Sequence, residues 1–515
     1  MTLAMVIATA VDEEDRPTAA LRLSDDAGAS VFDRLRGQLL SLGAGDVELL
    51  VLRKNMDAFA DASARVVDAD DPAGALREVA RLARETDGPL IVAAGDVVAH
   101  REALAGLVAA PGDSTGALVE TIRAADDGAA DPARPSVRVE HDRVVSAASA
   151  YHWVTMPNAR SLGVLRIAAA DLPRLAAAAD ELAELAGEYG EYGEDTEKRL
   201  GDPVGLLLVG LVRGGVRVAA RDVRVLTARR VTSGQALRDT ERRIAGTDEE
   251  RVRLESAVKG DDGLFTTYAV STYSRYIARW AARRGLSPNT ITFSNLGVAV
   301  LAALWFSSGT RAGMIAGAVF LYAAFVLDCV DGQLARYARK FSPLGAWLDA
   351  TGDRAKEYIA YAGLAVGSAT GGFGDAWGLA IAAMLVQTLR HMIDFSYAGA
   401  VVTDVAALPR RSLRDHGDGL DDHVSVPAQA GTVPRQRSGA ALGRSVVRLS
   451  RSLDSRGWLR WVKKVIVLPI GERFALICVL AAATTPRITF VALLAWGGLA
   501  ACYTLAGRVF RSLAR

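Results

Sequence analysis

The sequence predicts an N-terminal α/β soluble domain followed by an all-α membrane domain of six transmembrane helices. In the first half of the 515 residues, short apolar runs alternate with amphipathic helical stretches, which is typical of α/β domains. From about Pro288 onward, long apolar runs approach the roughly 20 residues that a helix needs to cross a bilayer. The expected divisions are a domain at 1–231, a charged helical connector at 232–262 and a membrane domain at 263–515.

The first domain is expected to contain a largely parallel sheet. Its predicted strands and helices are the strands 3–10, 47–52 and 89–96 and the helices 30–44 and 71–86. The segments 89–107, 142–149 and 161–175 resemble the sugar-nucleotidyltransferases, some of which are fused to membrane enzymes as inositol-phosphate cytidylyltransferases. If the domain is an active nucleotidyltransferase, the resemblance implies that Asp96 is a metal ligand. If Asp96 is purely structural, it is expected to cap a helix that begins near Val97.

One departure from that resemblance concerns the loop after the first strand. Those transferases have a glycine-rich loop and a basic residue there, because backbone amides and a cation hold the triphosphate. Residues 8–20 here contain no glycine and carry Asp12, Glu13, Glu14 and Asp15 in a row. We therefore expect a degenerate domain that binds, regulates or dimerises. The connector is predicted to be one solvent-exposed helix at about 236–257.

Six spans are predicted in the membrane domain, and the fifth is short. They are expected at about 289–307, 313–331, 346–368, 376–398, 472–483 and 488–509. Two stretches are predicted to lie in the headgroup layer. One has Tyr273, Tyr276, Ile277 and Trp280 on a single helical face, and the other carries Trp458, Trp461, Lys463 and Lys464.

Four aspartates lie beside and within these apolar runs, in the segment 328–353. A single Asp at the centre of a membrane helix costs roughly 2.5 to 3.5 kcal/mol, so four of them need compensation. Asp328 and Asp331 are three residues apart and Asp349 and Asp353 are four apart, so each pair lies on one helical face. Such oxygen ligands suit Mg²⁺ or Mn²⁺, although isolated pairs of this kind are more often solvated helix-end charges.

The segment as a whole reads D-x2-D-G-x2-A-R-x8-G-x3-D-x3-D, from Asp328 to Asp353. This pattern resembles the signature of the CDP-alcohol phosphotransferases, membrane enzymes that displace CMP from a CDP-linked alcohol with the hydroxyl of a second alcohol. The resemblance implies two divalent ions, Mg²⁺ or Mn²⁺, held by Asp328, Asp331, Asp349 and Asp353. It also implies that Asp353 is the general base, and that the enzyme is a homodimer.

The resemblance further implies that Gly332, Ala335, Arg336, Gly345 and Asn289 contact the nucleotide. Each has a structural alternative: tight helix packing for the glycines, a positive-inside anchor for Arg336 and helix capping for Asn289. Arg390 and His391 interrupt the fourth span and are candidates for binding the acceptor. Their alternative role is structural, as partners of Asp394 or of backbone carbonyls.

Basic residues predict the orientation of this multi-pass protein in the cell membrane. Arg336, Arg339 and Lys340 follow the second span, and residues 369–374 after the third span hold no Lys or Arg. The connection 401–464 is rich in arginine. Both termini and the aspartates are therefore expected to face the cytoplasm. Residues 408–443 are expected to be disordered, with His416 and His423 as solvated residues rather than metal ligands.

The predicted function is transfer of a phosphatidyl or phospho-polyol group from a CDP-alcohol to an acceptor alcohol, with release of CMP. The fused domains favour a polyol phosphate, such as an inositol phosphate, as the acceptor. The lipid bilayer is an expected partner and nucleic acid is not. Two alternatives stay open at this point: a bifunctional enzyme whose first domain makes the CDP-alcohol, and a non-enzymatic membrane protein that handles ions.

Overall fold

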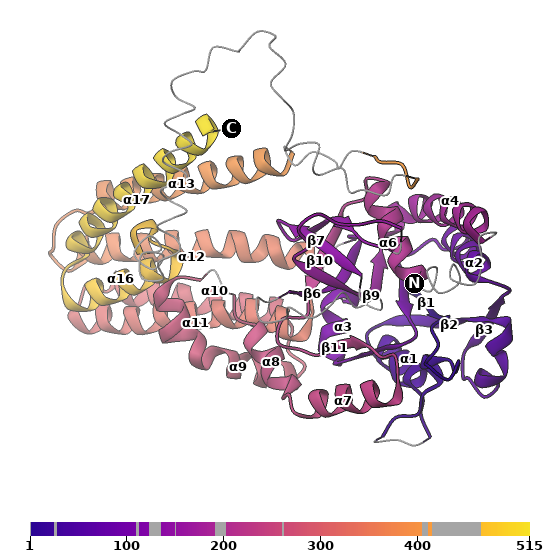
Figure 1. The fold of residues 1–515 in the computed structure, drawn as a ribbon. Coiled ribbons are helices and arrows are strands. Elements are labelled where there is room, and N and C mark those ends of the chain that lie inside the picture. The colour runs from indigo at the N-terminus through magenta and orange to yellow at the C-terminus, as the bar shows by residue number, and fades with distance from the viewer. Residues whose placement is uncertain are drawn as a thin grey trace, which may run out of the picture. The chain divides into compact units, whose positions relative to one another are not determined.

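The computed structural model describes residues 2–24, 28–109, 113–122, 135–149, 151–190, 202–259, 262–403, 410–414 and 465–514 (Figure 1). The chain forms two compact units. The first comprises Met1–Val252 with Ala406–Gln429, and the second comprises Arg253–Val405 with Ala430–Arg515. The boundary therefore lies about 20 residues beyond the predicted end of the first domain, because the first part of the connector belongs to the first unit.

A nine-stranded sheet forms the centre of the first unit, in the order β3-β2-β1-β4-β9-β6-β10-β8-β7. Its strands are β1 (Thr2–Ala8), β2 (Ala44–Leu52), β3 (Arg65–Ala69), β4 (Leu90–Ala94), β6 (Gly116–Thr121), β7 (Ser136–Glu140), β8 (Arg143–Ala147), β9 (Ala159–Ile167) and β10 (Val218–Asp222). The four strands from β3 to β4 are parallel, as predicted. The other half is mixed, because β9 runs antiparallel to both β4 and β6.

Helices α1 (Val31–Ser41), α2 (Pro72–Glu85), α3 (Arg101–Val108), α4 (Leu172–Gly190) and α6 (Pro203–Arg213) also belong to this unit (Figure 1). The predicted helices at 30–44 and 71–86 are confirmed, and side-chain caps explain where they begin. Ser30 forms a capping box with Asp33, and Asp71 accepts from the amide of Gly74 ahead of a proline in the first turn. The apolar α6 is buried throughout, within the core of the first unit.

The connector consists of two helices, α7 (Gly234–Ala245) and α8 (Glu249–Ser256), and not of the single exposed helix that was predicted. Gly246 ends α7, and Asp248 accepts from the amide of Arg251 at the start of the next helix. Leu237 of α7 is buried in a small apolar cluster of the first unit, and Glu241 accepts from the amide of Ser24. The charged face is therefore solvated while the opposite face of α7 packs onto the first unit.

The second unit is helical, and a helix occurs at each of the six predicted spans. These are α10 (Pro288–Ser307), α11 (Arg311–Ala338), α12 (Pro343–Thr370), α13 (Trp377–Thr403), α16 (Ile470–Ala483) and α17 (Pro486–Ala514). Within the described residues, only Pro288–Ser307, Arg311–Ala338 and Pro486–Val509 are both long and apolar enough to cross a membrane. The sixfold crossing therefore stays a prediction, since α16 has 14 residues.

Helix α10 packs against both α11 and α12, and glycines allow a close approach (Figure 1). A Cβ on Gly363 of α12 would meet the carbonyl oxygen of Ala303 at 2.6 Å. A Cβ on Gly317 of α11 would meet the ring of Phe306 at 2.5 Å. Small residues at such contacts are typical of helix packing in membranes. Large apolar side chains such as Phe293 and Leu304 are exposed on the outer face of α10, as expected for a surface that contacts lipid.

Two predicted surface segments have different outcomes. Helix α9 (Ser271–Arg283) follows a π-helical turn at Thr266–Val270, and its Tyr276 and Trp280 are about half exposed, in agreement with the predicted amphipathic face. The second predicted interfacial stretch, with Trp458 and Trp461, lies outside the described residues, as do His416 and His423.

Residues 410–414 belong to the loop that was predicted to be disordered, and these five residues are ordered. The Leu413 side chain is buried in the core of the first unit, and His152 Nε2 lies 2.9 Å from the Leu413 carbonyl oxygen. Arg414 forms two hydrogen bonds of 3.0 Å with Glu188 of α4. The prediction of disorder is therefore wrong for this short segment, which is attached to the first unit by side-chain and backbone contacts.

Candidate active site

The aspartates of the motif lie on α11 and α12, and α10 packs against both helices. Helix α11 ends at Ala338, and its C-cap residue Arg339 adopts the left-handed conformation with φ of 53°. Ser342 then caps α12 by accepting from the amide of Gly345, and Pro343 occupies the first turn. The short connection thus reverses the chain within a few residues. Carboxylates that are separated by a loop in the sequence come to face one another.

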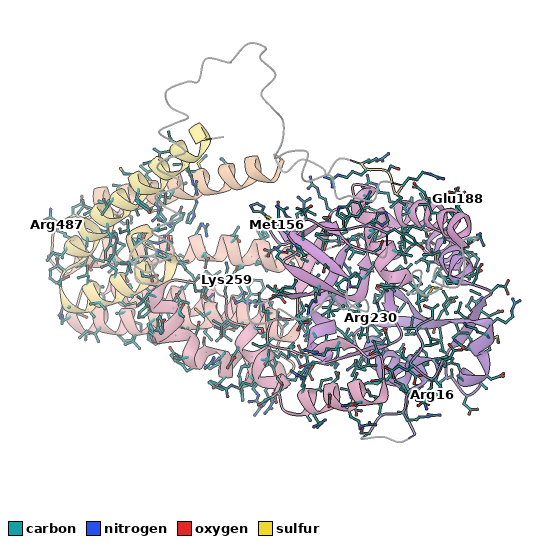
Figure 2. The ribbon with its side chains drawn as sticks, in the orientation of Figure 1. Arg16, Met156, Glu188, Arg230, Lys259 and Arg487 are labelled. Atoms are coloured by element: carbon teal, nitrogen blue, oxygen red, sulfur yellow. The ribbon has the colours of Figure 1, made fainter. Side chains whose placement is uncertain are left out.

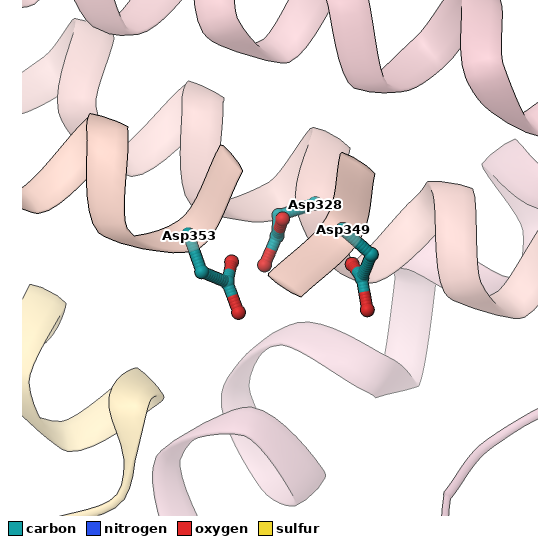
Figure 3. A group of neighbouring side chains, drawn as sticks. All are labelled: Asp328, Asp349 and Asp353. Atoms are coloured by element: carbon teal, nitrogen blue, oxygen red, sulfur yellow. The ribbon is translucent and has the colours of Figure 1, made fainter. Parts of the chain in front are cut away.

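Asp328, Asp349 and Asp353 each place a carboxylate oxygen within 4.8 Å of the other two (Figure 3). We call these three residues the carboxylate cluster. Asp349 is exposed, whereas Asp328 and Asp353 are partly buried. Among the described residues, no side chain or backbone amide donates a hydrogen bond to Asp349. The cluster therefore combines two compensated carboxylates with one that is open, an arrangement of hard oxygen donors that fits a divalent cation.

Asp331, the fourth predicted metal ligand, is not part of this three-residue cluster. It is almost fully buried, and its Oδ2 accepts a hydrogen bond of 2.8 Å from Thr292 Oγ1 of α10. Asn295, one turn further along α10, donates from Nδ2 to Asp328 Oδ1 at 3.0 Å. Within the described part of the chain, the Oδ1 atom of the buried Asn295 has no hydrogen-bond partner. This orphaned acceptor next to Asp328 is a further oxygen that suits a cation.

Lys356 was not predicted as a site residue, yet its ammonium group lies at the carboxylate cluster. Its Nζ donates to Asp328 Oδ1 and forms an ion pair of 3.0 Å with Asp353 Oδ1. Only 1% of the side chain is exposed. The available sequence signal was the spacing of three from Asp353, which puts both residues on one face of α12. The contact with Asp328 joins α12 to α11 and could not be read from local spacing.

The predicted nucleotide-binding residues lie in two groups on this helical unit. The Arg336 guanidinium lies close to Gly332, where an added Cβ would meet Nη1 at 3.3 Å. A Cβ on Gly345 would meet Asn289 Oδ1 at 3.1 Å, so this glycine allows the start of α10 to approach α12. Arg336 Nε also donates to the Ala257 carbonyl at 2.5 Å, which is a structural role beside any contact with phosphate. Ala335 is partly buried on α11.

Arg390 and His391, the predicted acceptor-binding residues, have polar contacts inside the second unit. Arg390 Nη2 donates to the Val467 carbonyl at 2.6 Å, so a backbone carbonyl is one of its partners, as the structural alternative predicted. Arg354 Nη2 lies 2.8 Å from His391 Nδ1, and the Gln387 amide lies 2.9 Å from His391 Nε2. His391 is therefore in contact with Arg354, the residue that directly follows Asp353. The side chain of Asp394 lies outside the described part of the structure.

A buried ion pair next to this group was also missed from the sequence. Arg473 of α16 donates from Nε and Nη2 to Glu357 Oε1 at 2.9 and 2.6 Å. The side chains are 6% and 0% exposed. Glu357 and Arg473 interrupt two apolar stretches that are more than 100 residues apart in the chain. A charged residue is unusual in an apolar stretch, so Glu357 and Arg473 could each have been noticed in the sequence. Their spacing does not show that they form a pair.

In the first unit, Asp96 neither caps a helix nor stands open to a metal. It is followed by strand β5 (Val97–Ala99), which pairs with β11 (Ala228–Arg230). Arg230 Nε donates to both carboxylate oxygens of Asp96, at 2.9 and 3.1 Å, and Nη1 lies 2.8 Å from Asp202 (Figure 2 labels Arg230). Burial alone would lower the pKa of Arg230, but the carboxylates of Asp202 and Asp96 raise it above its usual value. An internal cation thus occupies this position.

The acidic loop that follows β1 is held by its own side chains. Asp12 accepts from the backbone amides of Glu14 and Arg16, and from Arg16 Nε and Nη2. Burial alone would raise the pKa of Asp12, but the hydrogen bonds from Arg16 and Glu14 lower it below its usual value. Two of the amides that such a loop could offer to an anion are here bound to the carboxylate of Asp12.

Comparison with known proteins gives a family match, curated relatives and similar solved structures. Residues 286–409 match the CDP-alcohol phosphatidyltransferase family. The phosphatidylinositol phosphate synthases of Streptomyces avermitilis and Mycolicibacterium smegmatis are 32% and 33% identical over 112 and 138 residues, which are 21% and 27% of this chain and 45% and 60% of those proteins. An archaetidylinositol phosphate synthase of Methanothermobacter thermautotrophicus is 36% identical over 99 residues, 19% of this chain and 48% of that protein.

The chain therefore spans about half the length of the curated relatives that it matches. Among solved structures, the inositol-1-phosphate CTP transferase from T. maritima aligns with 48% of this chain and 98% of its own, at 16% identity and a TM-score of 0.34. The matched family segment includes the complete motif from Asp328 to Asp353, the two helices that carry the carboxylate cluster and helix α10, which packs against both. Over residues 286–409, the chain is therefore similar to the CDP-alcohol phosphatidyltransferase family.

Proposed function

We propose that this protein transfers a phosphatidyl or phospho-polyol group from a CDP-alcohol to the hydroxyl of an acceptor alcohol and releases CMP. One observation carries the proposal. The eight positions of the motif are present, and three of its aspartates, from two helices, have carboxylate oxygens within 4.8 Å of one another. Carboxylates at that separation in a helical unit are costly without cations, and they are suited to a reaction at a diphosphate.

In this proposal Asp328, Asp331, Asp349 and Asp353 hold one or two divalent ions, Mg²⁺ or Mn²⁺. Such ions, when bound, supply the positive charge that stabilises the diphosphate and the departing CMP. Asp353 also accepts the proton of the attacking hydroxyl and so acts as the general base. Asp331, which is held by Thr292, contributes fixed negative charge from the adjoining turn of α11.

The donor nucleotide is proposed to lie against Gly332, Ala335, Arg336, Gly345 and Asn289. The closeness of the Arg336 guanidinium to Gly332 supports a phosphate contact there, because a planar fork of donors matches phosphate oxygens. The absence of a side chain at Gly332 leaves backbone accessible beside that fork. The phosphates of a CDP-alcohol would therefore contact the Arg336 guanidinium and the helix backbone at Gly332.

Arg390 and His391 are proposed to face the acceptor. The link from Arg354 to His391 supports this, because it joins the residue beside the proposed base to the fourth predicted span. The acceptor is proposed to be a polyol phosphate of the inositol phosphate type. The printed names of the relatives support that class, since they are phosphatidylinositol phosphate and archaetidylinositol phosphate synthases.

The membrane setting is also part of the proposal. Six helices are proposed to cross the cell membrane, with both termini and the carboxylate cluster toward the cytoplasm, and two copies of the chain are proposed to form a dimer. Three helices of sufficient length and apolarity support membrane insertion. The arginine-rich connection at 401–464 supports the orientation, because cytoplasmic loops carry an excess of basic residues.

The first unit is proposed to be a degenerate nucleotidyltransferase-like domain without transfer activity of its own. Two observations support this. Arg230 is bound to Asp96, which follows β4, and two amides of the glycine-free loop are bound to Asp12. The full-length protein is therefore expected to release no pyrophosphate from CTP and a polyol phosphate. CTP-dependent pyrophosphate release would instead support the bifunctional alternative.

The transfer reaction is tested by measuring CMP release from purified membranes with Mg²⁺ or Mn²⁺. CDP-diacylglycerol and CDP-inositol are each offered with a panel of polyols and polyol phosphates. We expect one donor to give CMP only when an acceptor is present. No release from any combination would refute the enzyme proposal. For the site variant Asp353→Asn, Asp375→Asn is the matched control, because the exposed Asp375 accepts from the amide of Trp377 at the start of α13 and asparagine can accept in the same way.

A further inference from the structure

We propose that the Lys356 ammonium serves as a built-in cation of the carboxylate cluster, so that the resting protein binds a single divalent ion tightly and a second one weakly. The inference rests on the proposed function, since it concerns the ions of the same site. Lys356 is a positioning residue in this view. It holds Asp328 and Asp353 at a fixed separation and limits the number of bound ions.

The first step of the argument is the location of the ammonium group. Nζ of Lys356 contacts Asp328 on α11 and Asp353 on its own helix, so it bridges the two helices that carry the cluster. Its side chain is 1% exposed, so the charged group is almost completely removed from solvent. A buried lysine is retained where its charge is compensated. Here the two carboxylates of the cluster are its partners.

The second step is the uneven bonding of the three carboxylates. Asp328 Oδ1 accepts from both Lys356 and Asn295, and Asp353 Oδ1 is paired with Lys356. Among the described residues, Asp349 receives no comparable hydrogen bond or ion pair, and it is the exposed member. An incoming cation therefore meets Asp349 as an open ligand. A second cation between Asp328 and Asp353 would have to displace the ammonium group.

The third step is the balance of charge. The three carboxylates of the cluster and the neighbouring Asp331 have a formal charge of −4, of which one lysine and one divalent ion neutralise three. A second divalent ion would leave an excess of positive charge, and its repulsion from the ammonium is strong at the contact distances of a buried site. In the absence of substrate, whose phosphates bring further negative charge, the second ion is therefore expected to bind at least tenfold more weakly than the first.

The test is the stoichiometry of Mn²⁺ binding to the purified full-length chain in detergent, in the absence of nucleotide. The free Mn²⁺ at each step of the titration is measured by electron paramagnetic resonance. Lys356→Met keeps the length and apolar stem of the side chain and removes its charge, and Lys356→Gln provides a second neutral variant. Lys340→Met is the matched control, because Lys340 is exposed at the end of α11 and makes no ion pair with the cluster. Asp349→Asn reports whether the measured ion is bound at the cluster.

We expect one tight Mn²⁺ per wild-type chain, and a second Mn²⁺ whose affinity rises at least tenfold in both neutral Lys356 variants and not in Lys340→Met. A merely structural lysine would not change the number of bound ions. Two ions of similar affinity in the wild type, unchanged in the variants, would overturn the inference and leave the proposed function intact. Absence of any Mn²⁺ binding that depends on Asp349 would overturn the inference together with the metal site of the proposed function. If one of the Lys356 variants fails to fold, the wild-type stoichiometry and the other variant still test the inference.

Discussion

The buried pair of Arg473 and Glu357 permits a direct test of how the second unit is held together. Replacing Arg473 by methionine preserves an extended apolar side chain and removes three hydrogen bonds, two to Glu357 and one to the Leu468 carbonyl. Glu357 has no exposed surface, so its carboxylate is left buried without the partner that compensates it. Breaking such a pair typically costs about 3 to 5 kcal/mol.

The assay is thermal unfolding of the full-length protein in detergent. After heating to each temperature, the protein that stays soluble is measured by size-exclusion chromatography. Arg473→Met should lower the melting temperature markedly. The double variant Arg473→Met with Glu357→Gln should recover a substantial part of the loss, because no unpaired charge is left behind. Arg487→Met is the control, since Arg487 is exposed near the start of α17 (Figure 2). Equal losses for the two arginine variants, or a double variant that loses the sum of both singles, would refute the reasoning.

Two further predictions concern the first unit. Arg230→Met should destabilise this unit by about 3 to 5 kcal/mol, because Asp96 stays buried without its cation. The loss of stability is measured as a loss of protease resistance in the full chain. Resistance equal to that of the wild type would contradict the prediction. The lowered pKa of Asp12 predicts a dependence on acid. A carboxylate with a lowered folded-state pKa stabilises the fold above its unfolded value of about 3.9, and that contribution is lost as the pH falls through the folded value. Exchange protection of the Glu14 and Arg16 amides should therefore be present above about pH 4 and fall below it, and Asp12→Asn should remove this step.

The parts of the fold that were predictable are those encoded by local patterns. Apolar runs of the right length gave the strands β1, β2 and β4 and the helical segments of the second unit. The same runs do not carry strand direction, so the antiparallel position of β9 between β4 and β6 was missed. The break between α7 and α8 was signalled by Gly246 and the capping Asp248, but the regular charge pattern favoured one continuous helix.

The candidate site divides in the same way. The aspartates were recognisable because the motif is contiguous, and helical spacing placed each pair on one face. The contacts of Lys356 with Asp328 and of Asn295 with Asp328 join different helices, so no local pattern reveals them. Asp96 illustrates the limit most clearly. Its partner Arg230 is 134 residues away in the chain, and only the pairing of β5 with β11 brings the two together.

The central claim is that the carboxylate cluster transfers a group from a CDP-alcohol with Asp353 as the base. The most direct measurement is acceptor-dependent CMP release by the wild type and by Asp353→Asn, together with Mn²⁺ binding by both proteins. We predict a rate at least 10² lower in the variant, which corresponds to about 2.7 kcal/mol in the barrier, with a folded protein that still binds Mn²⁺ through Asp349. Turnover by Asp353→Asn at the wild-type rate would contradict the account.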